Sequence, residues 1–187
     1  GDGGVAALVE RDEKFGKSYF SLNSDGSRAD LIMIKGGGYR HPSSEETLRE
    51  KVVDEYGNIR SDEQGYMQGG DVFNFVIREI PRDIKKTLEY AGDTADSFDY
   101  IVFHQANNFI NAYIAKKMKL DTDKIPSTIA KYGNTSSVSV PLTIVSELKD
   151  RLYGNKKLLL SAFGVGMTWA TGIVPFVDCK ISDIVEV

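Results

Sequence analysis

The sequence contains very little cysteine, since Cys179 is the only one among its 187 residues. A lone thiol cannot form a disulfide within the chain, which agrees with the reducing environment of the cytoplasm. Histidine is almost as rare, with only His41 and His104, and we expect no metal site. His41 lies in a polar loop close to glycines, so His104 is the histidine that draws attention.

Long apolar runs and an excess of basic charge are also absent. No stretch approaches the length needed to cross a bilayer, and no signal-peptide pattern is present. The net charge is −4, from 23 basic and 27 acidic residues, which argues against binding to nucleic acid. With 41% hydrophobic and 27% charged residues, the composition is that of an ordinary globular domain. We expect a cytoplasmic protein that binds neither membranes nor nucleic acids.

Short apolar runs alternate along the chain with segments of helical periodicity. The runs predict strands at residues 5–11, 18–22, 31–34, 100–103, 158–163 and 167–177. Helical spacing predicts helices at residues 72–91, 109–118 and 136–148. Pro81 should kink or split the first of these helices. Strands that alternate with helices predict an α/β fold.

The segment His104-Gln105-Ala106-Asn107 directly follows a predicted strand and precedes a predicted helix. In an open α/β sheet, ligands and catalytic groups gather at such strand ends. Two other loops have a similar character, namely residues 133–137, which lead into a helix, and the turn Gly164-Val165-Gly166. On this basis alone, a packing role and a catalytic role both remain open for His104.

The three loops together offer a definite chemistry if they converge at one edge of the sheet. An imidazole and a carboxamide supply two N–H donors to one oxygen, which stabilises negative charge as an enolate or tetrahedral oxyanion forms. Glycine turns add backbone N–H groups and let the main chain approach a ligand closely.

These loops, with two further segments, resemble the motifs of the β-ketoacyl-acyl carrier protein synthase III family, in the thiolase superfamily. Residues 1–4 resemble the Gly-Asp-Gly-Ala segment that opens the family's C-terminal half, and residues 67–73 resemble its Met-x-Gly-x-x-Val-Phe segment. Residues 104–107 and 133–136 match its His-Gln-Ala-Asn and Gly-Asn-Thr-Ser motifs, and residues 163–169 are similar to its glycine-rich closing turn. The resemblance covers nearly the whole chain, with the motifs in the family's order.

The resemblance implies that His104 and Asn134 are catalytic. In the family's Cys-His-Asn set, the cysteine accepts an acyl group from acyl-CoA. Histidine and asparagine donate hydrogen bonds to the thioester carbonyl of malonyl-acyl carrier protein, and loss of CO₂ gives a carbanion that attacks the acyl-cysteine. His104 would then work as a neutral imidazole. Gln105, Asn107 and the turn Gly164-Val165-Gly166 would contact the substrate or the oxyanion.

The family's nucleophilic cysteine has no counterpart in the sequence. Cys179 follows the last predicted strand, with no base beside it in sequence, and a structural thiol is the expected role. The resemblance therefore implies that residues 1–187 form a C-terminal thiolase-like domain of a longer chain, whose N-terminal half holds the cysteine. We expect a mixed five-stranded sheet with helices on both faces.

The resemblance further implies that the complete protein is an acyltransferase of fatty acid biosynthesis. Residues 1–187 alone would be inactive, because the catalytic cysteine is missing. The complete enzyme would be a cytoplasmic homodimer that uses coenzyme A and phosphopantetheine thioesters as substrates, without another cofactor. Its partners would be acyl-CoA and malonyl-acyl carrier protein. Two alternatives stay open, namely acyl transfer without condensation and a non-catalytic domain that docks a carrier protein.

The sequence departs from the family pattern at two positions. Phe109 stands where family members often have an arginine that helps to bind the carrier protein, although Lys116 and Lys117 match basic positions on the same helix. Val165 stands at the middle of a turn that is often three glycines, and valine resists a positive φ. We expect a specialised relative, with another acyl chain or carrier.

Overall fold

The structure is a computed structural model that describes residues 2–11, 13 and 15–186. The chain forms two compact units. The larger unit comprises residues 1–23, 76–164 and 168–187, and the smaller one comprises residues 24–75 and 165–167. Gly1, which opens the glycine-rich segment at residues 1–4, lies outside the described residues.

A four-stranded sheet with the order β1-β8-β7-β6 forms the centre of the larger unit. Its strands are β1 (Tyr19–Ser24), β6 (Tyr100–Phe103), β7 (Asn155–Gly164) and β8 (Thr168–Val177). The sheet is mixed, because β6 pairs with β7 in parallel and β7 pairs with β8 antiparallel. Within the larger unit, His104 directly follows the end of β6 and lies beside Ser161 of β7.

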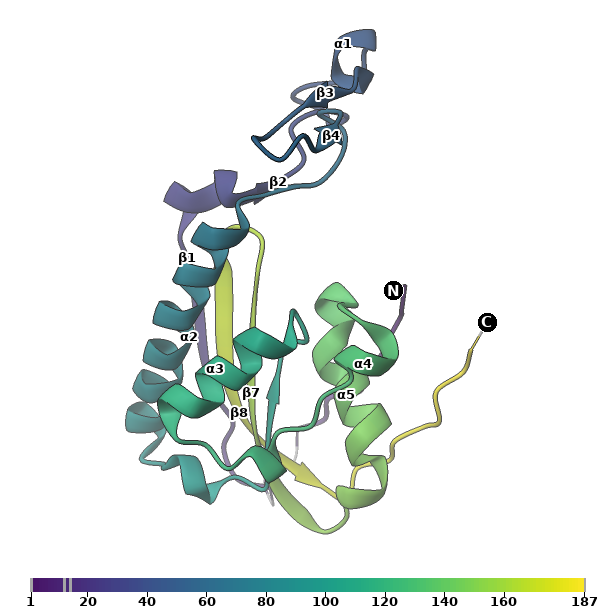
Figure 1. Ribbon diagram of the computed structural model, residues 1–187. Helices are drawn as coiled ribbons and strands as arrows, with labels where there is room; N and C mark the ends of the chain where they lie inside the picture. The colour runs from purple at the N-terminus through teal and green to yellow at the C-terminus, as the bar shows by residue number, and fades with distance from the viewer. Residues whose placement is uncertain (1, 12, 14, 187) are drawn as a thin grey trace. The chain divides into compact units, whose positions relative to one another are not determined.

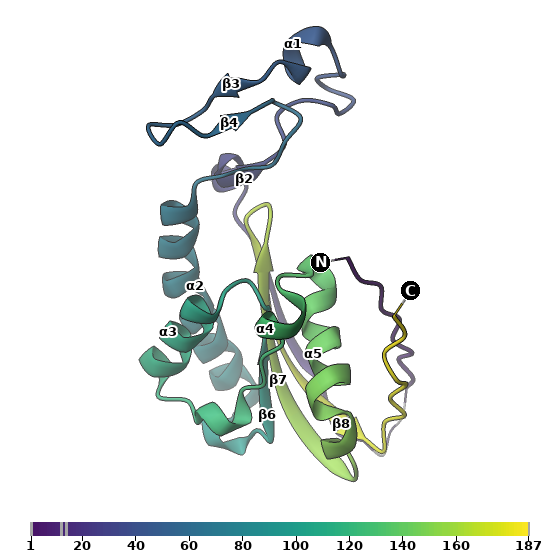
Figure 2. The same cartoon turned by 45° about the vertical axis from the view of Figure 1, so that its right-hand side comes forward.

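Helices cover both faces of this sheet (Figure 1 and Figure 2). They are α2 (Gly69–Ala91), α3 (Asn108–Met118), α4 (Ile129–Tyr132) and α5 (Ser139–Leu148). On one face, Val102 and Leu158 form a buried cluster with Leu148 of α5. On the other, Thr171 of β8 donates a hydrogen bond of 2.6 Å to the buried Asp83 of α2. Among the helices of the described residues, none is long and apolar enough to cross a membrane.

The strand expected at residues 5–11 is absent, and the sheet of the larger unit has four strands among the described residues, where five were expected. This segment has no regular secondary structure, and the side chains of Leu8 and Val9 are each 89% exposed. A strand needs a hydrogen-bonded neighbour, and nothing in the described part of the chain pairs with this one. Its apolar pattern alone therefore did not produce a strand.

Pro81 does not split α2, and the helix runs from Gly69 to Ala91 without a break. Proline has no N–H to donate to the carbonyl four residues earlier, which belongs to Ile77. The ammonium of Lys117, on α3, donates to that same carbonyl oxygen at 2.7 Å. The lost helix bond is therefore replaced by a tertiary one, and Gly92 (φ 69°) follows the last helical residue, as expected from the sequence.

The smaller unit consists of short elements. It contains a 3₁₀ segment (Gly26–Leu31), β2 (Ile32–Met33), α1 (Glu45–Leu48), β3 (Lys51–Val52), β4 (Ile59–Arg60) and β5 (Tyr66–Met67). Strand β2 pairs with β5 and β3 pairs with β4, both antiparallel. Ser44 and Thr47 form a reciprocal capping box at the start of α1, which accounts for a helix of only one turn.

Candidate active site

His104 is held at the tip of β6 by both of its backbone groups. Its N–H donates to the carbonyl oxygen of Ser161 at 2.8 Å, which continues the ladder with β7 by one residue. Its carbonyl oxygen accepts a bond of 3.2 Å from the side-chain amide of Asn111, on α3. The main chain of His104 is therefore fixed, which limits the positions that its side chain can take, as precise placement of a reacting group requires.

The imidazole of His104 is half-buried and makes two contacts. Its ring lies edge-on to Phe163 with 5.1 Å between centroids, and Nδ1 lies 2.6 Å from the hydroxyl oxygen of Ser139 at the start of α5. Burial lowers the pKa of His104 below its usual value, because a low-dielectric environment disfavours the charged form. The imidazole is therefore neutral at physiological pH, and Nε2 has no hydrogen-bond partner among the described residues.

Gln105 is fully buried and lies behind the site, in contrast to its expected contact with substrate. Its side-chain N–H donates to the carbonyl oxygen of Phe103 at 2.7 Å. Its amide oxygen accepts from the hydroxyl of Ser127 at 3.2 Å and from the backbone N–H of Thr128 at 2.9 Å. With 0% of its surface exposed, Gln105 ties the His104 loop to the segment before α4.

Asn107 is the N-cap of α3. Its side-chain oxygen accepts bonds from the backbone N–H groups of Phe109 and Ile110, at 2.7 and 3.3 Å. These two donors would otherwise lack partners in the first turn of the helix. Asn107 is exposed, and its expected contact with substrate stays a prediction.

Asn134 lies in the loop that leads into α5, and its side chain is oriented by the backbone. Its Oδ1 accepts the N–H of Ser136 at 2.9 Å, while Ser136 itself has a positive φ of 55°. This Asx turn uses the acceptor end of the carboxamide, so the Nδ2 donor end remains available. Asn134 is exposed.

The hydroxyls of Thr135 and Ser136 do not cap the following helical segments, although threonine and serine are common N-cap residues. Neither the 3₁₀ turn at Ser136–Val138 nor α5 has a side-chain cap. Instead, Asn134 supplies the side-chain acceptor in this loop. The loop therefore orients Asn134 through an Asx turn, and the helical segments that follow begin without a side-chain cap.

Val165 raised the question whether the turn at residues 164–166 forces a positive φ on a valine. The structure shows that it does not. Gly164 ends β7 opposite Thr168, and the positive φ of the turn, 139°, falls on Gly166. Val165 has no positive φ and is 61% exposed. Gly164 belongs with His104 to the larger unit, whereas Val165 and Gly166 belong to the smaller one.

The two lysines predicted to dock a carrier protein differ in their surroundings. Lys117 is engaged with the Ile77 carbonyl of α2, while Lys116 is exposed on the last turn of α3. The hydrogen bond gives Lys117 a structural role that its spacing in the sequence did not indicate.

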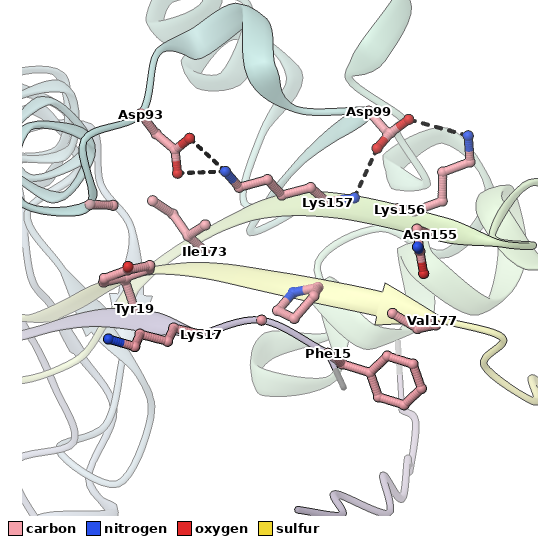
Figure 3. A pocket seen from close by; sticks show the side chains of 13 residues that line it. Phe15, Lys17, Tyr19, Asp93, Asp99, Asn155, Lys156, Lys157, Ile173 and Val177 are labelled. Carbon is pink, nitrogen blue, oxygen red and sulfur yellow. Dashed lines mark hydrogen bonds and ion pairs between the residues drawn. The ribbon is translucent and has the colours of Figure 1, made fainter. Parts of the chain in front are cut away.

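No group of three or more histidine, cysteine or acidic side chains is placed to hold a metal ion, within the residues that the structure describes. Cys179 is an exposed free thiol just after β8. A cavity of about 440 Å³ lies at the opposite end of β6 from His104, beside Asp99 (Figure 3). Two of its lining lysines pair with its aspartates, Lys157 with Asp93 at 2.5 Å and Lys156 with Asp99 at 3.2 Å, so these two lysines are already engaged with carboxylates.

The sequence did not identify Ser139 or Asn111 as residues of the site. Ser139 lies 35 positions from His104 and Asn111 lies seven, and no spacing rule connects either residue to the histidine. A mid-chain serine at the start of a helix is common, so its type gave no signal either.

Residues 88–176 match the family model described as 3-oxoacyl-[acyl-carrier-protein] synthase III C terminal. The fold is therefore thiolase-like, and the resemblance to the synthase III family seen in the sequence is confirmed.

Among particular relatives, the chain is similar to the β-ketoacyl-[acyl-carrier-protein] synthase III of Streptococcus pneumoniae, with 34% identity over 178 residues, covering 93% of this chain and 51% of that protein. It is also similar to the crystal structure of a 3-oxoacyl-(acyl-carrier protein) synthase from Burkholderia xenovorans, with a TM-score of 0.77, 36% identity, and coverage of 89% of this chain and 46% of that one. For the Thermus thermophilus synthase III, the TM-score is 0.73 at 26% identity, with 92% and 50% covered. The chain therefore spans about half the length of the relatives it matches.

Proposed function

We propose that this chain supplies the decarboxylation half of a β-ketoacyl-acyl carrier protein synthase III, in which His104 and Asn134 bind the thioester carbonyl of malonyl-acyl carrier protein. The observation that supports this most is the placement of His104, which is half-buried and has no hydrogen-bond partner at Nε2 among the described residues. Burial lowers its pKa, which favours the neutral imidazole. The Asx turn leaves Nδ2 of Asn134 as a second donor. If both N–H groups reach the same oxygen, they form an oxyanion site.

The chemistry then follows from these two donors. The bond between the malonyl α-carbon and its carboxylate breaks, CO₂ leaves, and the electron pair remains on the α-carbon as an enolate whose charge lies largely on the thioester oxygen. The two N–H groups stabilise that charge. The α-carbon attacks the acyl-thioester of a cysteine in the other half of the enzyme, and the cysteine leaves as a thiolate.

The test is decarboxylation of malonyl-acyl carrier protein by the complete protein. His104→Ala and Asn134→Ala should each lower the rate on the order of 10²- to 10³-fold, as expected for loss of one oxyanion donor. His41→Ala removes the other histidine, which is exposed in the smaller unit, and should leave the rate unchanged. Full activity in both site variants would refute the proposal.

The same variants discriminate between the other functions considered. If the protein transfers an acyl group without condensation, Asn134→Ala should matter much less than His104→Ala. If it binds acyl carrier protein but the complete protein shows no turnover, a docking role replaces catalysis.

We further propose that the complete protein is a cytoplasmic homodimer that takes its acyl group from acyl-CoA without another cofactor. Exposed apolar side chains such as Val5, Leu8 and Val9 support association with a further surface, since single domains seldom expose apolar segments of this kind. A clean monomer of this chain in gel filtration would count against association.

We also propose that Lys116 contacts the acidic carrier protein. Lys116→Glu should raise the KM for malonyl-acyl carrier protein several-fold while leaving kcat unchanged, and the effect should weaken as salt screens the charges. An unchanged KM at low salt would exclude this contact.

A further inference from the structure

We infer that the hydroxyl of Ser139 holds His104 in the tautomer that carries its proton on Nε2. Ser139 is thereby a positioning residue, which acts through the histidine and does not itself touch the substrate. Its effect on catalysis rests on the function proposed above, whereas its effect on the tautomer does not.

The contact that supports this inference is short and buried. Nδ1 of His104 and Oγ of Ser139 are 2.6 Å apart, and Ser139 is 1% exposed. At that distance one of the two atoms must donate a proton. Either the hydroxyl donates to Nδ1, which leaves the ring proton on Nε2, or Nδ1 carries the proton and donates it to Oγ.

The remaining contacts of Ser139 decide between these two arrangements. Its Oγ accepts the backbone N–H of Gln105 at 3.3 Å, and this bond uses a lone pair and not the hydroxyl proton. Among the described residues, Nδ1 of His104 is therefore the one acceptor available to that proton. If Nδ1 were the donor, the hydroxyl proton would be buried without an acceptor, which costs about 1–3 kcal/mol.

The serine is itself held in place from the other side. Its carbonyl oxygen accepts the hydroxyl of Thr143 at 2.8 Å, one helical turn further along α5, and Thr143 also bonds to the hydroxyl of Thr128. Two buried threonines therefore hold the backbone of Ser139, which carries the hydroxyl that contacts His104.

This arrangement has a direct consequence for the proposed chemistry. The two ring nitrogens lie on opposite sides of the imidazole, so fixing Nδ1 as the acceptor directs the Nε2 proton away from Ser139. Among the residues that the structure describes, Nε2 has no hydrogen-bond partner, and its N–H can then donate to a thioester oxygen. In the other tautomer, Nε2 would present a lone pair and would repel that oxygen.

The first test measures the tautomer in the complete protein by ¹⁵N NMR of labelled histidine, with the resonances assigned by comparison with His104→Asn. The wild-type spectrum should show Nδ1 unprotonated and Nε2 protonated at neutral pH. A proton on Nδ1 in wild type would overturn the inference, whatever the protein catalyses. This measurement needs no variant of Ser139 to fold.

The second test compares Ser139→Ala and Ser139→Thr with Ser146→Ala, a control two turns along the same helix. Ser139→Ala should shift the tautomer population toward Nδ1–H and lower kcat for malonyl decarboxylation about ten-fold, the equivalent of one hydrogen bond, with KM unchanged. Ser139→Thr keeps the hydroxyl and should restore the wild-type tautomer. If Ser139→Ala has the wild-type tautomer and the wild-type kcat, the inference is overturned. If the wild-type protein shows no decarboxylation at all, only the proposed function is overturned.

Discussion

The buried carboxylate of Asp83 should be a principal determinant of the stability of the larger unit. It is 5% exposed and has no cationic partner among the described residues, yet it joins three elements. From β1, the hydroxyl of Ser21 and the amide of Asn23 donate to it at 2.5 and 2.8 Å, and the hydroxyl of Thr171 on β8 donates at 2.6 Å. Replacing Asp83 therefore breaks the link between α2 and two strands.

The expected cost can be worked from these three bonds. Hydrogen bonds to a charged group contribute about 1.5–3 kcal/mol each. Ser21 and Asn23 are half-buried and would regain water in the variant, so the lower end of that range applies. Asp83→Ala should thus lower the free energy of unfolding by about 4 kcal/mol. Asp83→Asn keeps the volume and one acceptor, and should cost about 1–2 kcal/mol.

The assay is urea-induced unfolding of the complete protein, with native-state hydrogen exchange to locate the loss. Exchange resolves separate units where a single unfolding transition does not, and the amides of β8 and α2 should lose protection first. Glu89→Gln, on the exposed face of the same helix, should change the unfolding free energy by less than about 0.5 kcal/mol. An Asp83→Ala variant as stable as this control would refute the reasoning.

Three further predictions follow from the site and from α2. Because burial lowers the pKa of His104 below its usual value of 6.5, the decarboxylation rate should hold as pH falls through 6.5 and decline only below it; a decline centred above pH 6.5 would contradict this. Lys117→Met should cost about 1 kcal/mol in wild type but much less in a Pro81→Ala background, where residue 81 regains the N–H that bonds to Ile77; equal costs in a double-mutant cycle by urea unfolding would contradict it. Val165→Gly should leave kcat unchanged, because the positive φ falls on Gly166; a clear gain in steady-state kcat would show that valine strains the turn.

Apolar runs and helical spacing in the sequence predicted much of the fold, because both patterns depend on residues that are close together in the chain. The run before His104 and the helical spacing after it correspond to β6 and α3, and the apolar runs flanking the glycine turn correspond to β7 and β8. Periodicity reports which face of a segment is apolar, and in these elements that face is buried.

Features that depend on distant partners could not be predicted in this way. The run at residues 5–11 has the pattern of a strand but no neighbour to pair with. Pro81 is accommodated by Lys117, 36 positions away, and Gln105 is buried because Thr128 binds its amide. The contact of Ser139 with His104 spans 35 positions. These are tertiary contacts that no local pattern contains.

The most direct test of the account is a crystal structure of the complete protein with a malonyl thioester analogue that cannot lose CO₂. We predict that Nε2 of His104 and Nδ2 of Asn134 both lie about 3 Å from the same thioester oxygen. An analogue whose carbonyl contacts only one of them, or neither, would contradict the proposed site.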